Sequence, residues 1–430
     1  MEKKIKWCAI QPLTGGMYLG TEKAVGCPAE FILSYPGVGD PIYDKKTNKL
    51  VGGGNEFHLM TYLDKVGRRP EYKVFNRQMF QNDDDMNPEI LSSRWTINED
   101  KPLDYSDMDL VVAVPVCSGL STATIGTEEA KAARNCNMTW ITKYALRVIQ
   151  PKVYIFENAP TFMGARGEYL RKQFEILAKE TGYSIVYYKT DTQYHDNCQK
   201  RKRTFIVFFK KEFAPAMGFE RIETDYDEYF ARIPKDATQQ EPFDFNTVNC
   251  VNLYCLQYLK AKFGDEWRNK ITNIFEYIIG NKLFDEVLDF IDKSGATEKQ
   301  KYSMNHFFEH VQYKLSINRG FYHALPFIPR DGKLPAVMFK MMQSVLHPHE
   351  DRLLSTRECL HLMGHPHDFE MQGVPLHEYP KIGQNVPART AYWIVSEALR
   401  AYDRNNDLEE IKNVRFFDNM KQAEQKYEAA

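Results

Sequence analysis

A series of short apolar segments in the first part of the chain most limits what it can fold into. Helical patterns separate several of these segments, and this alternation predicts βαβ units around a sheet. The expected fold class is therefore α/β, with a doubly wound, mostly parallel sheet. In such a sheet, ligands bind where the strands end at their carboxyl edge. The expected strands are Trp7–Ile10, Phe31–Ser34, Leu110–Val114, Val153–Glu157, Ser184–Lys189 and Thr204–Phe209, and the expected helices include Trp140–Ile149 and Tyr169–Lys179.

The sequence pattern changes after residue 211, and it divides the chain into three expected parts. An α/β domain spans residues 1–211, a second, smaller domain spans 212–343, and a C-terminal segment, 344–430, returns to the first domain. Within the first domain the stretch from Pro36 to Asp107 is less regular. We expect it to form mainly loops around the sheet, with a strand or two.

Helical periodicity dominates the later parts of the chain. Apolar residues at helical spacing predict one helix over Glu266–Asp292 and an amphipathic helix over Ala388–Tyr402. After Leu408 the chain is highly charged, which predicts a solvated helix.

The overall charge excludes a polycation that binds phosphate over its whole surface. The 430 residues include 56 Lys and Arg against 58 Asp and Glu, a formal net charge of -2, so any nucleic-acid surface must be local. Lys260, Lys262, Arg268 and Lys270 either contact phosphate or form a solvated helix face. No apolar stretch approaches the roughly 20 residues that span a bilayer, and no signal-peptide core follows Met1, so we expect a cytoplasmic protein that is not bound to a membrane.

Eight cysteines are spread over the long chain, which is not the density of a secreted disulfide scaffold. We therefore expect reduced thiols. Cys250 and Cys255 have no second Cys or His pair at matching spacing, so we assign no metal site.

Reactive side chains follow two of the expected strands. The apolar run before Pro115 leads to Cys117, which places a thiol at the ligand edge of the sheet, although a buried structural cysteine is the alternative. The next strand ends in Glu157 and Asn158, and burial there should raise the pKa of Glu157 so that it stays protonated. Arg201 and Arg203 alternate at the start of a further strand, so both can point to one side.

The order of these motifs resembles the catalytic motifs of cytosine-5 DNA methyltransferases. The matching elements are Pro115-Val116-Cys117, Glu157-Asn158, Gln199-Lys200-Arg201-Lys202-Arg203, the segment from Arg352 to Glu358, Ile382-Gly383-Gln384-Asn385-Val386-Pro387 and the glycine turn Gly15-Gly16. Each match is weak alone, but six in family order over nearly the whole chain are specific.

The resemblance implies a fold, a donor and a partner. The fold is the Rossmann-like fold of S-adenosylmethionine-dependent methyltransferases, with residues 212–343 as a target-recognition domain. The substrate is double-stranded DNA, and the enzyme is expected to be a monomer. S-adenosylmethionine binds around Thr14, Gly15, Gly16, Met17, Pro115 and Asn385.

The resemblance also gives each catalytic position a role. Cys117 adds to carbon 6 of a flipped cytosine, while protonated Glu157 bonds ring nitrogen 3 and Asn158 positions the strand end. Arg203 holds the base carbonyl oxygen and Arg201 orders the active-site loop. Residues 118–127 form a loop that closes over the base, which must leave the stacked duplex.

The donor motifs depart from the family pattern. The family's F-x-G-x-G-G stands here as Gln11-Pro12-Leu13-Thr14-Gly15-Gly16, and Gln384 shifts the asparagine of the C-terminal motif by one position. The acidic residue that bonds the donor ribose falls near Ser34-Tyr35-Pro36, where no carboxylate stands. A modified sulfonium donor, such as carboxylated S-adenosylmethionine, is the alternative. A catalytically silent DNA-binding homologue and a tRNA-directed enzyme are two further alternatives.

Overall fold

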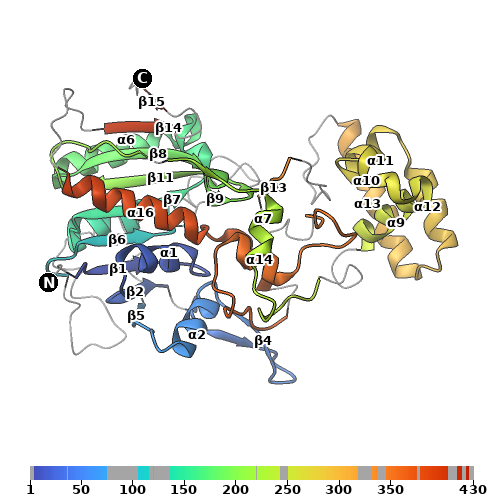
Figure 1. Cartoon of the computed structure of the whole chain (residues 1–430), viewed down its shortest axis with the longest axis horizontal. Helices are drawn as coiled ribbons and strands as arrows, with labels where there is room; N and C mark the ends of the chain where they lie inside the picture. Colours follow the sequence, from blue (N-terminus) through green and yellow to red (C-terminus); the bar gives the residue numbers. More distant parts are fainter. Residues whose placement is uncertain are drawn as a thin grey trace.

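The computed structural model describes residues 4–35, 37–74, 105–115, 120, 136–218, 220–242, 250–317, 331–336, 345–374, 378–404, 414–418 and 423–425. The architecture is a central sheet with helices on both faces, and a separate group of helices lies at one end (Figure 1). No helix among these residues is long and apolar enough to cross a membrane.

The described residues form a nine-stranded sheet in the order β15-β14-β8-β11-β7-β6-β1-β2-β5. The five strands β5, β2, β1, β6 and β7 run parallel to one another, and β11 runs antiparallel between β7 and β8. The expected doubly wound, mostly parallel sheet is confirmed. The strands are β1 (Trp7–Ile10), β2 (Phe31–Ser34), β5 (Glu71–Val74), β6 (Leu110–Ala113), β7 (Val153–Asn158), β8 (Ser184–Asp191), β11 (Lys202–Phe209), β14 (Val414–Asp418) and β15 (Ala423–Gln425).

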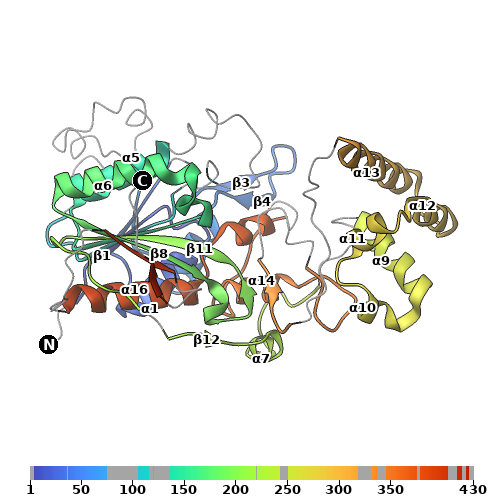
Figure 2. The same cartoon turned by 90° about the horizontal axis from the view of Figure 1, so that it is seen from above.

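The two faces of the sheet carry separate hydrophobic cores, because successive side chains of a strand point to opposite faces. On β1, Trp7 and Ala9 belong to one core, whereas Cys8 and Ile10 belong to the other. Helices α1 (Gly16–Val25) and α16 (Ala388–Asp403) cover the first face, and α5 (Cys136–Tyr144), continued by η3 (Ala145–Ile149), and α6 (Glu168–Thr181) cover the second (Figure 2).

Helices α1 and α16 pack unusually closely, and glycine permits the approach. A Cβ on Gly20 would lie 2.2 Å from the Ala388 carbonyl oxygen and 2.6 Å from the Ala391 Cβ. Helix α16, near the C-terminal end of the chain, therefore belongs to the same hydrophobic core as α1. The chain reaches α16 through α14 (Thr356–Leu362), which begins with a capping box between Ser355 and Glu358, and through η9 (Tyr379–Gln384).

The stretch after β2 is more regular than the sequence suggests. Strands β3 (Pro41–Tyr43) and β4 (Leu50–Gly53) form an antiparallel hairpin, and α2 (Phe57–Lys65) leads into β5 at the sheet edge. The expectation of mainly loops is wrong for residues 37–74. Residues 75–104 lie outside the described part of the chain.

The expected single helix over Glu266–Asp292 is wrong. The chain breaks after α10 (Trp267–Lys270) and again before Leu283, because Asn273 caps α11 (Ile274–Gly280) through its side chain and Lys282 has a φ of 55°. The apolar spacing still holds, since Ile274, Ile278 and Val287 are all buried. The helical module comprises α9 (Cys250–Phe263), η7 (Gly264–Glu266), α10, α11, α12 (Phe284–Lys293) and α13 (Glu298–Ser316).

The segment that precedes the helical module contacts the part of the chain that contains the central sheet. Strand β12 (Ile222–Glu223) pairs with β9 (His195–Asn197), and Asn197 donates to the Tyr229 hydroxyl of α7 (Tyr226–Ala231) at 3.1 Å. A second short pair joins β10 (Gln199–Lys200) to β13 (Leu334–Pro335). The three domain limits inferred from sequence remain predictions.

The solvated helix expected after Leu408 is also corrected within the described residues. β14 joins the sheet parallel to β8, and the ring of Phe417 lies 6.4 Å from that of Tyr188. Arg415 is buried and donates from Nε to the Ala214 carbonyl oxygen at 2.7 Å. Apolar and charged residues mix here without helical spacing, so an edge strand suits the segment better than a helix.

Candidate active site

The nucleophile expected from sequence cannot be placed. β6 ends at Ala113, and Pro115 is buried just beyond it. Residues 116–119 and 121–135 lie outside the described residues, so Cys117 and nearly all of the expected closing loop have no structural account. The position of Pro115 nevertheless fixes where the chain leaves the sheet, at the carboxyl edge beside β7.

Glu157 and Arg203 come together at this edge. Glu157 is 4% exposed near the end of β7, and the antiparallel register sets it opposite Phe205 of β11. The Arg203 Nε lies 2.6 Å from Glu157 Oε1. Burial raises the pKa of Glu157, while the positive charges of Arg203 and Arg201 oppose the rise. The net direction is upward, so the site favours a protonated carboxyl more than water does.

Asn158 is fully buried and shapes the turn that follows β7. Its Oδ1 accepts a hydrogen bond from the Ala159 N–H at 2.9 Å, and its Nδ2 lies 3.6 Å from Met138 Sδ. The Asn158 side chain therefore makes its described contacts with other residues of the protein. The chain continues into two short helices, η4 (Pro160–Met163) and η5 (Ala165–Gly167).

Among the described residues, Arg201 contacts residues 383–385, and its expected role in ordering residues 118–127 stays a prediction. Its guanidinium, 2% exposed, donates from Nη2 to the carbonyl oxygens of Gly383 at 2.9 Å and Asn385 at 2.8 Å. The Asp191 carboxylate accepts the Arg201 backbone N–H at 2.8 Å. Arg201 thus anchors residues 383–385 beside the start of β11.

Residues 381–386 in turn hold the glycine turn at the end of β1. The Gly16 N–H donates to Asn385 Oδ1 at 2.9 Å, and the Thr14 hydroxyl donates to the Lys381 carbonyl oxygen at 3.1 Å. Gln11 and Leu13 have φ values of 51° and 54°, and Gly15 has 103°. Backbone in this left-handed region is costly for residues other than glycine and is often found at functional sites. Met17 is fully buried one residue further on.

The sequence reasoning missed Glu56, an acidic residue beside the end of β2. Glu56 is fully buried at the N-cap position of α2, and the Tyr72 hydroxyl donates to its Oε2 at 2.9 Å. Its Oε1 has no hydrogen-bond partner among the described residues. Burial raises the pKa of Glu56 to about 8, against the opposing effect of the hydroxyls of Ser34 and Tyr72.

Glu56 also lies close to the glycine turn. One turn further along α2, the Leu59 Cδ1 lies 2.5 Å from where a Cβ of Gly15 would be. The Glu56 carboxylate, which arrives after the β3–β4 hairpin, interacts with the Ser34 hydroxyl at the end of β2. The sequence signal that could have indicated Glu56 is the glycine run just before it. A Cβ on Gly54 would lie 2.0 Å from the Val38 carbonyl oxygen, so the chain at Gly54 packs tightly against the segment that follows β2.

The basic residues of the helical module bind carboxylates of the protein itself. Lys260 and Arg268 both pair with Asp351, at 2.6 and 2.7 Å, and Lys262 pairs with Glu286. Lys270 pairs with Glu266 on an exposed helix turn at 3.2 Å. Each of these four cations is thus paired with a carboxylate of the protein, and whether any of them also contacts phosphate stays a prediction.

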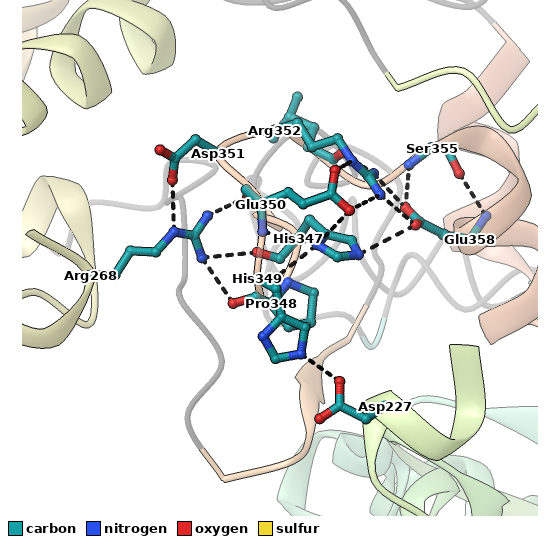
Figure 3. A network of polar contacts seen from close by, with 11 residues as sticks. Asp227, Arg268, His347, Pro348, His349, Glu350, Asp351, Arg352, Ser355 and Glu358 are labelled. Atoms are coloured by element: carbon teal, nitrogen blue, oxygen red, sulfur yellow. Dashed lines mark hydrogen bonds and ion pairs between the residues drawn. The ribbon is translucent and has the colours of Figure 1, made fainter. Parts of the chain in front are cut away.

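Arg268 is the centre of a network that joins the helical module to the segment before α14 (Figure 3). Besides Asp351, its guanidinium donates to the carbonyl oxygens of His347 at 3.1 Å, Pro348 at 2.9 Å and Glu350. Arg352 continues the network to Glu358, whose carboxylate also accepts the Ser355 N–H at 2.7 Å. The capping box of α14 is thus linked to α10.

The model of the family "C-5 cytosine-specific DNA methylase" matches residues 85–400. The type II methyltransferase M.Bpa9945I of Bacillus paralicheniformis is 22% identical over 356 residues, 74% of this chain and 76% of that protein.

Solved structures resemble the fold. A candidate DNA modification methyltransferase encoded within an E. coli prophage aligns over 93% of this chain and 100% of its own, with a TM-score of 0.52 and 15% identity. The Entamoeba histolytica methyltransferase EhMeth aligns over 94% of this chain and 100% of its own, with a TM-score of 0.51 and 10% identity.

The sheet order, the helices on both faces and the glycine turn after β1 define the Rossmann-like fold of S-adenosylmethionine-dependent methyltransferases. The family match is more specific than the fold. The chain belongs to the C-5 cytosine-specific DNA methylase family, and it is accordingly a DNA cytosine-5 methyltransferase. Enzymes of this family take their methyl group from S-adenosylmethionine.

Proposed function

We propose that this chain methylates carbon 5 of a cytosine flipped out of double-stranded DNA, through a covalent adduct with Cys117. The pairing of Glu157 with Arg203 at the carboxyl edge of β7 carries the proposal. That edge is also where Pro115 delivers the chain toward Cys117 and where the glycine turn follows β1. With DNA as its substrate, the enzyme acts in the compartment that holds DNA, the cytoplasm of a bacterial host, and as a monomer.

The proposed reaction begins with the base. The Cys117 thiolate adds to carbon 6, and the electron pair moves to make carbon 5 nucleophilic while protonated Glu157 bonds ring nitrogen 3. Carbon 5 then takes the methyl group that the bound donor supplies. Loss of the carbon-5 proton and expulsion of the Cys117 thiolate restore the aromatic ring. Unstacking the base costs a few kcal/mol, which contacts in the pocket must offset.

Arg203 and Arg201 take different roles in this scheme. Arg203 is proposed to contact the base carbonyl oxygen while its Nε holds Glu157 in place. Arg201 is a positioning residue, since its guanidinium donates to Gly383 and Asn385. Asn158 is likewise a positioning residue at the end of β7. Asn385 in turn accepts a hydrogen bond from the Gly16 N–H, so Arg201 positions the glycine turn through Asn385.

The donor site proposed for S-adenosylmethionine lies around Thr14, Gly15, Gly16, Met17 and Pro115. The residues present fit such a donor, because glycine allows close backbone approach and the start of α1 favours a carboxylate. Glu56 is proposed to accept hydrogen bonds from the ribose hydroxyls, since its buried Oε1 has no partner among the described residues. Nothing in this geometry calls for the larger, carboxylated donor.

The test uses genomic DNA from a strain without cytosine-5 methylation. The full chain is incubated with this DNA and S-adenosylmethionine, and the digested nucleosides are weighed by mass spectrometry. We expect 5-methylcytosine with the wild type and none with Cys117→Ser. A silent homologue gives no modified base with either protein, and a larger donor group gives a heavier base when cell extract replaces the purified donor.

A parallel incubation with total tRNA distinguishes the nucleic acid. Modification confined to tRNA contradicts the proposal of a DNA substrate. Modification of DNA by Cys117→Ser at the wild-type rate contradicts the covalent mechanism, provided that both proteins show the same thermal unfolding.

A further inference from the structure

A groove of about 750 Å³, which we call the α1–α16 groove, runs along α1 and α16. These two helices lie on the sheet face opposite α5 and α6 (Figure 2). None of the proposed catalytic residues that the structure describes lines the groove. Its volume lies within the roughly 300–1,000 Å³ of small-molecule sites. Its charged and aromatic lining residues are Glu22, Lys23, Arg68, Asp196, Tyr229, Arg232, His361, His365, His367, Arg389, Tyr392 and Trp393.

The lining carries more cations than carboxylates. Four Lys and Arg residues face two Asp and Glu residues, which leaves an excess of two positive charges if the histidines are neutral. Glu22 neutralises one of these cations, Arg68, because its Oε2 lies 3.0 Å from Arg68 Nη1. The other three face a single carboxylate of the lining, and Glu228 beside the groove pairs with Arg232 at 2.6 Å, so an excess of one positive charge remains and the groove attracts anions.

That single carboxylate is Asp196, and it is shared by two guanidinium groups. Arg232 Nη1 lies 2.8 Å from Asp196 Oδ1, and Arg389 pairs with the other oxygen. Both guanidinium groups also lie over the ring of Tyr229, at 5.6 and 5.9 Å from its centroid. Glu228, outside the lining, pairs with the other Nη of Arg232 at 2.6 Å, so Arg232 is held by two carboxylates. Arg389, whose described ion pair is with Asp196 alone, is the guanidinium that can bind a phosphoryl group.

Two aromatic side chains lie one helical turn further along α16. Tyr392 and Trp393 both line the groove, with ring centroids 5.4 Å apart and ring planes at 75°, so each ring offers its own face. The Lys23 Nζ lies 5.3 Å from the centre of the Tyr392 ring and has no carboxylate partner among the described residues. Aromatic side chains beside cations can stack a flat heterocycle while the cations hold its phosphate.

A buried histidine in the lining of the groove has an unused polar atom. His365 is 3% exposed, and its Nε2 lies 3.0 Å from the Thr14 carbonyl oxygen, to which it can donate. Its Nδ1 has no hydrogen-bond partner among the described residues. A buried polar atom without a partner costs free energy, and a ligand donor can supply the missing partner.

We infer that the α1–α16 groove is a second ligand site, which binds a small phosphorylated molecule with a flat ring, such as a nucleoside monophosphate. Arg389 holds the phosphate, and Lys23 lies beside Tyr392 and Trp393, one of which stacks on the flat ring while the other meets its edge. The inference concerns a site apart from the donor and the flipped base, so it stands whether or not the proposed reaction is correct.

The test measures binding of AMP, with inorganic phosphate as a second probe, to the full chain by isothermal titration calorimetry. We expect one AMP per chain, weaker binding of phosphate at the same site, and no displacement of AMP by S-adenosylhomocysteine. Lys23→Glu reverses a charge on an exposed side chain, and it should weaken AMP binding about tenfold, the equivalent of about 1.4 kcal/mol. Arg389→Gln should weaken it at least as much.

The matched control is Lys179→Glu, the same charge reversal at an exposed position on α6, across the sheet. It should bind AMP like the wild type. Absence of AMP binding at millimolar concentration overturns the inference, as does binding that neither Lys23→Glu nor Arg389→Gln changes. Displacement by S-adenosylhomocysteine assigns AMP to the donor site instead. A short DNA duplex that loses affinity in Lys23→Glu, without any AMP binding, identifies the groove as a DNA surface and equally overturns the inference.

Discussion

Gly16 and Asn385, 369 positions apart, meet in one buried hydrogen bond of 2.9 Å. The amide oxygen of Asn385 accepts the first N–H of α1, which would otherwise be one of the donors left unpaired at a helix start. The donor turn and the C-terminal motif are therefore a single structural unit. Their close contact explains why glycine stands at position 16.

Gly16→Ala should damage this unit. The added Cβ would lie 1.8 Å from the Val386 carbonyl oxygen, a backbone atom that cannot rotate away. Overpacking of this kind costs about 1–3 kcal/mol. We expect a lower melting temperature and weaker binding of S-adenosylmethionine, measured by scanning fluorimetry and calorimetry. Gly280→Ala, where nothing lies within 4 Å of the new Cβ, is the control and should lose neither property.

Glu157→Gln should lower kcat without abolishing DNA binding. The amide keeps the size of the side chain but cannot protonate ring nitrogen 3, and general acid catalysis contributes about 10²- to 10⁴-fold. The wild-type rate should fall as pH rises through the raised pKa of Glu157, because the protonated form is the active one. A pH profile of single-turnover rates checks this. An alkaline limb that persists in Glu157→Gln would assign it to another group.

Glu56→Gln should stabilise the donor-free protein at alkaline pH. The folded-state pKa of about 8 lies above the ordinary value of 4.5. Protonated Glu56 therefore contributes stability that is complete below about pH 4.5 and is lost as pH rises through 8. The melting temperature of Glu56→Gln relative to wild type should rise by a few degrees between pH 6 and pH 9.

The same variant should bind the donor less well, because an amide is a poorer acceptor for two ribose hydroxyls. Glu298→Gln, at a position 92% exposed, is the matched control. Equal pH dependence of the two variants would contradict the assignment of the shift to Glu56.

Arg268→Ala should loosen the attachment of the helical module. Its guanidinium binds Asp351 and three backbone carbonyl groups between residues 347 and 350. Hydrogen exchange should accelerate about tenfold or more in residues 346–353, whereas α14 keeps its protection because Arg352 and Ser355 still bind Glu358. Lys270→Ala, which removes only an exposed pair with Glu266, should leave exchange unchanged. Since Arg268 is used internally, the salt dependence of DNA binding should not change by the slope of about one that a phosphate contact gives.

The strands of the parallel sheet were predictable because local apolar runs define them. Trp7–Ile10 and Phe31–Ser34 agree to the residue, and the other expected strands differ by one or two residues at their ends. Glu157 was predictable for the same reason, since it closes such a run. The features that the sequence did not predict depend on long-range contacts. Glu56 comes 22 residues after Ser34, beyond a hairpin that sequence alone does not show to fold back.

The partners that a side chain contacts were less predictable than the strand on which it lies. Arg201 was correctly placed at a strand start, but its partners lie more than 180 residues away. The strand Val414–Asp418 lies within a highly charged stretch of the sequence, and it is specified by its pairing with Ile185–Lys189. A single sequence holds no record of such pairings.

The dependence of the Gly16 N–H on Asn385 also sets an order of events during synthesis. A ribosome that has made the glycine turn must add some 370 further residues before the acceptor for this N–H emerges. Until then the start of α1 has no cap and the face later covered by α16 is bare. A nascent or prematurely terminated chain should therefore be unable to hold the methyl donor, so the enzyme gains its activity only when translation is nearly finished.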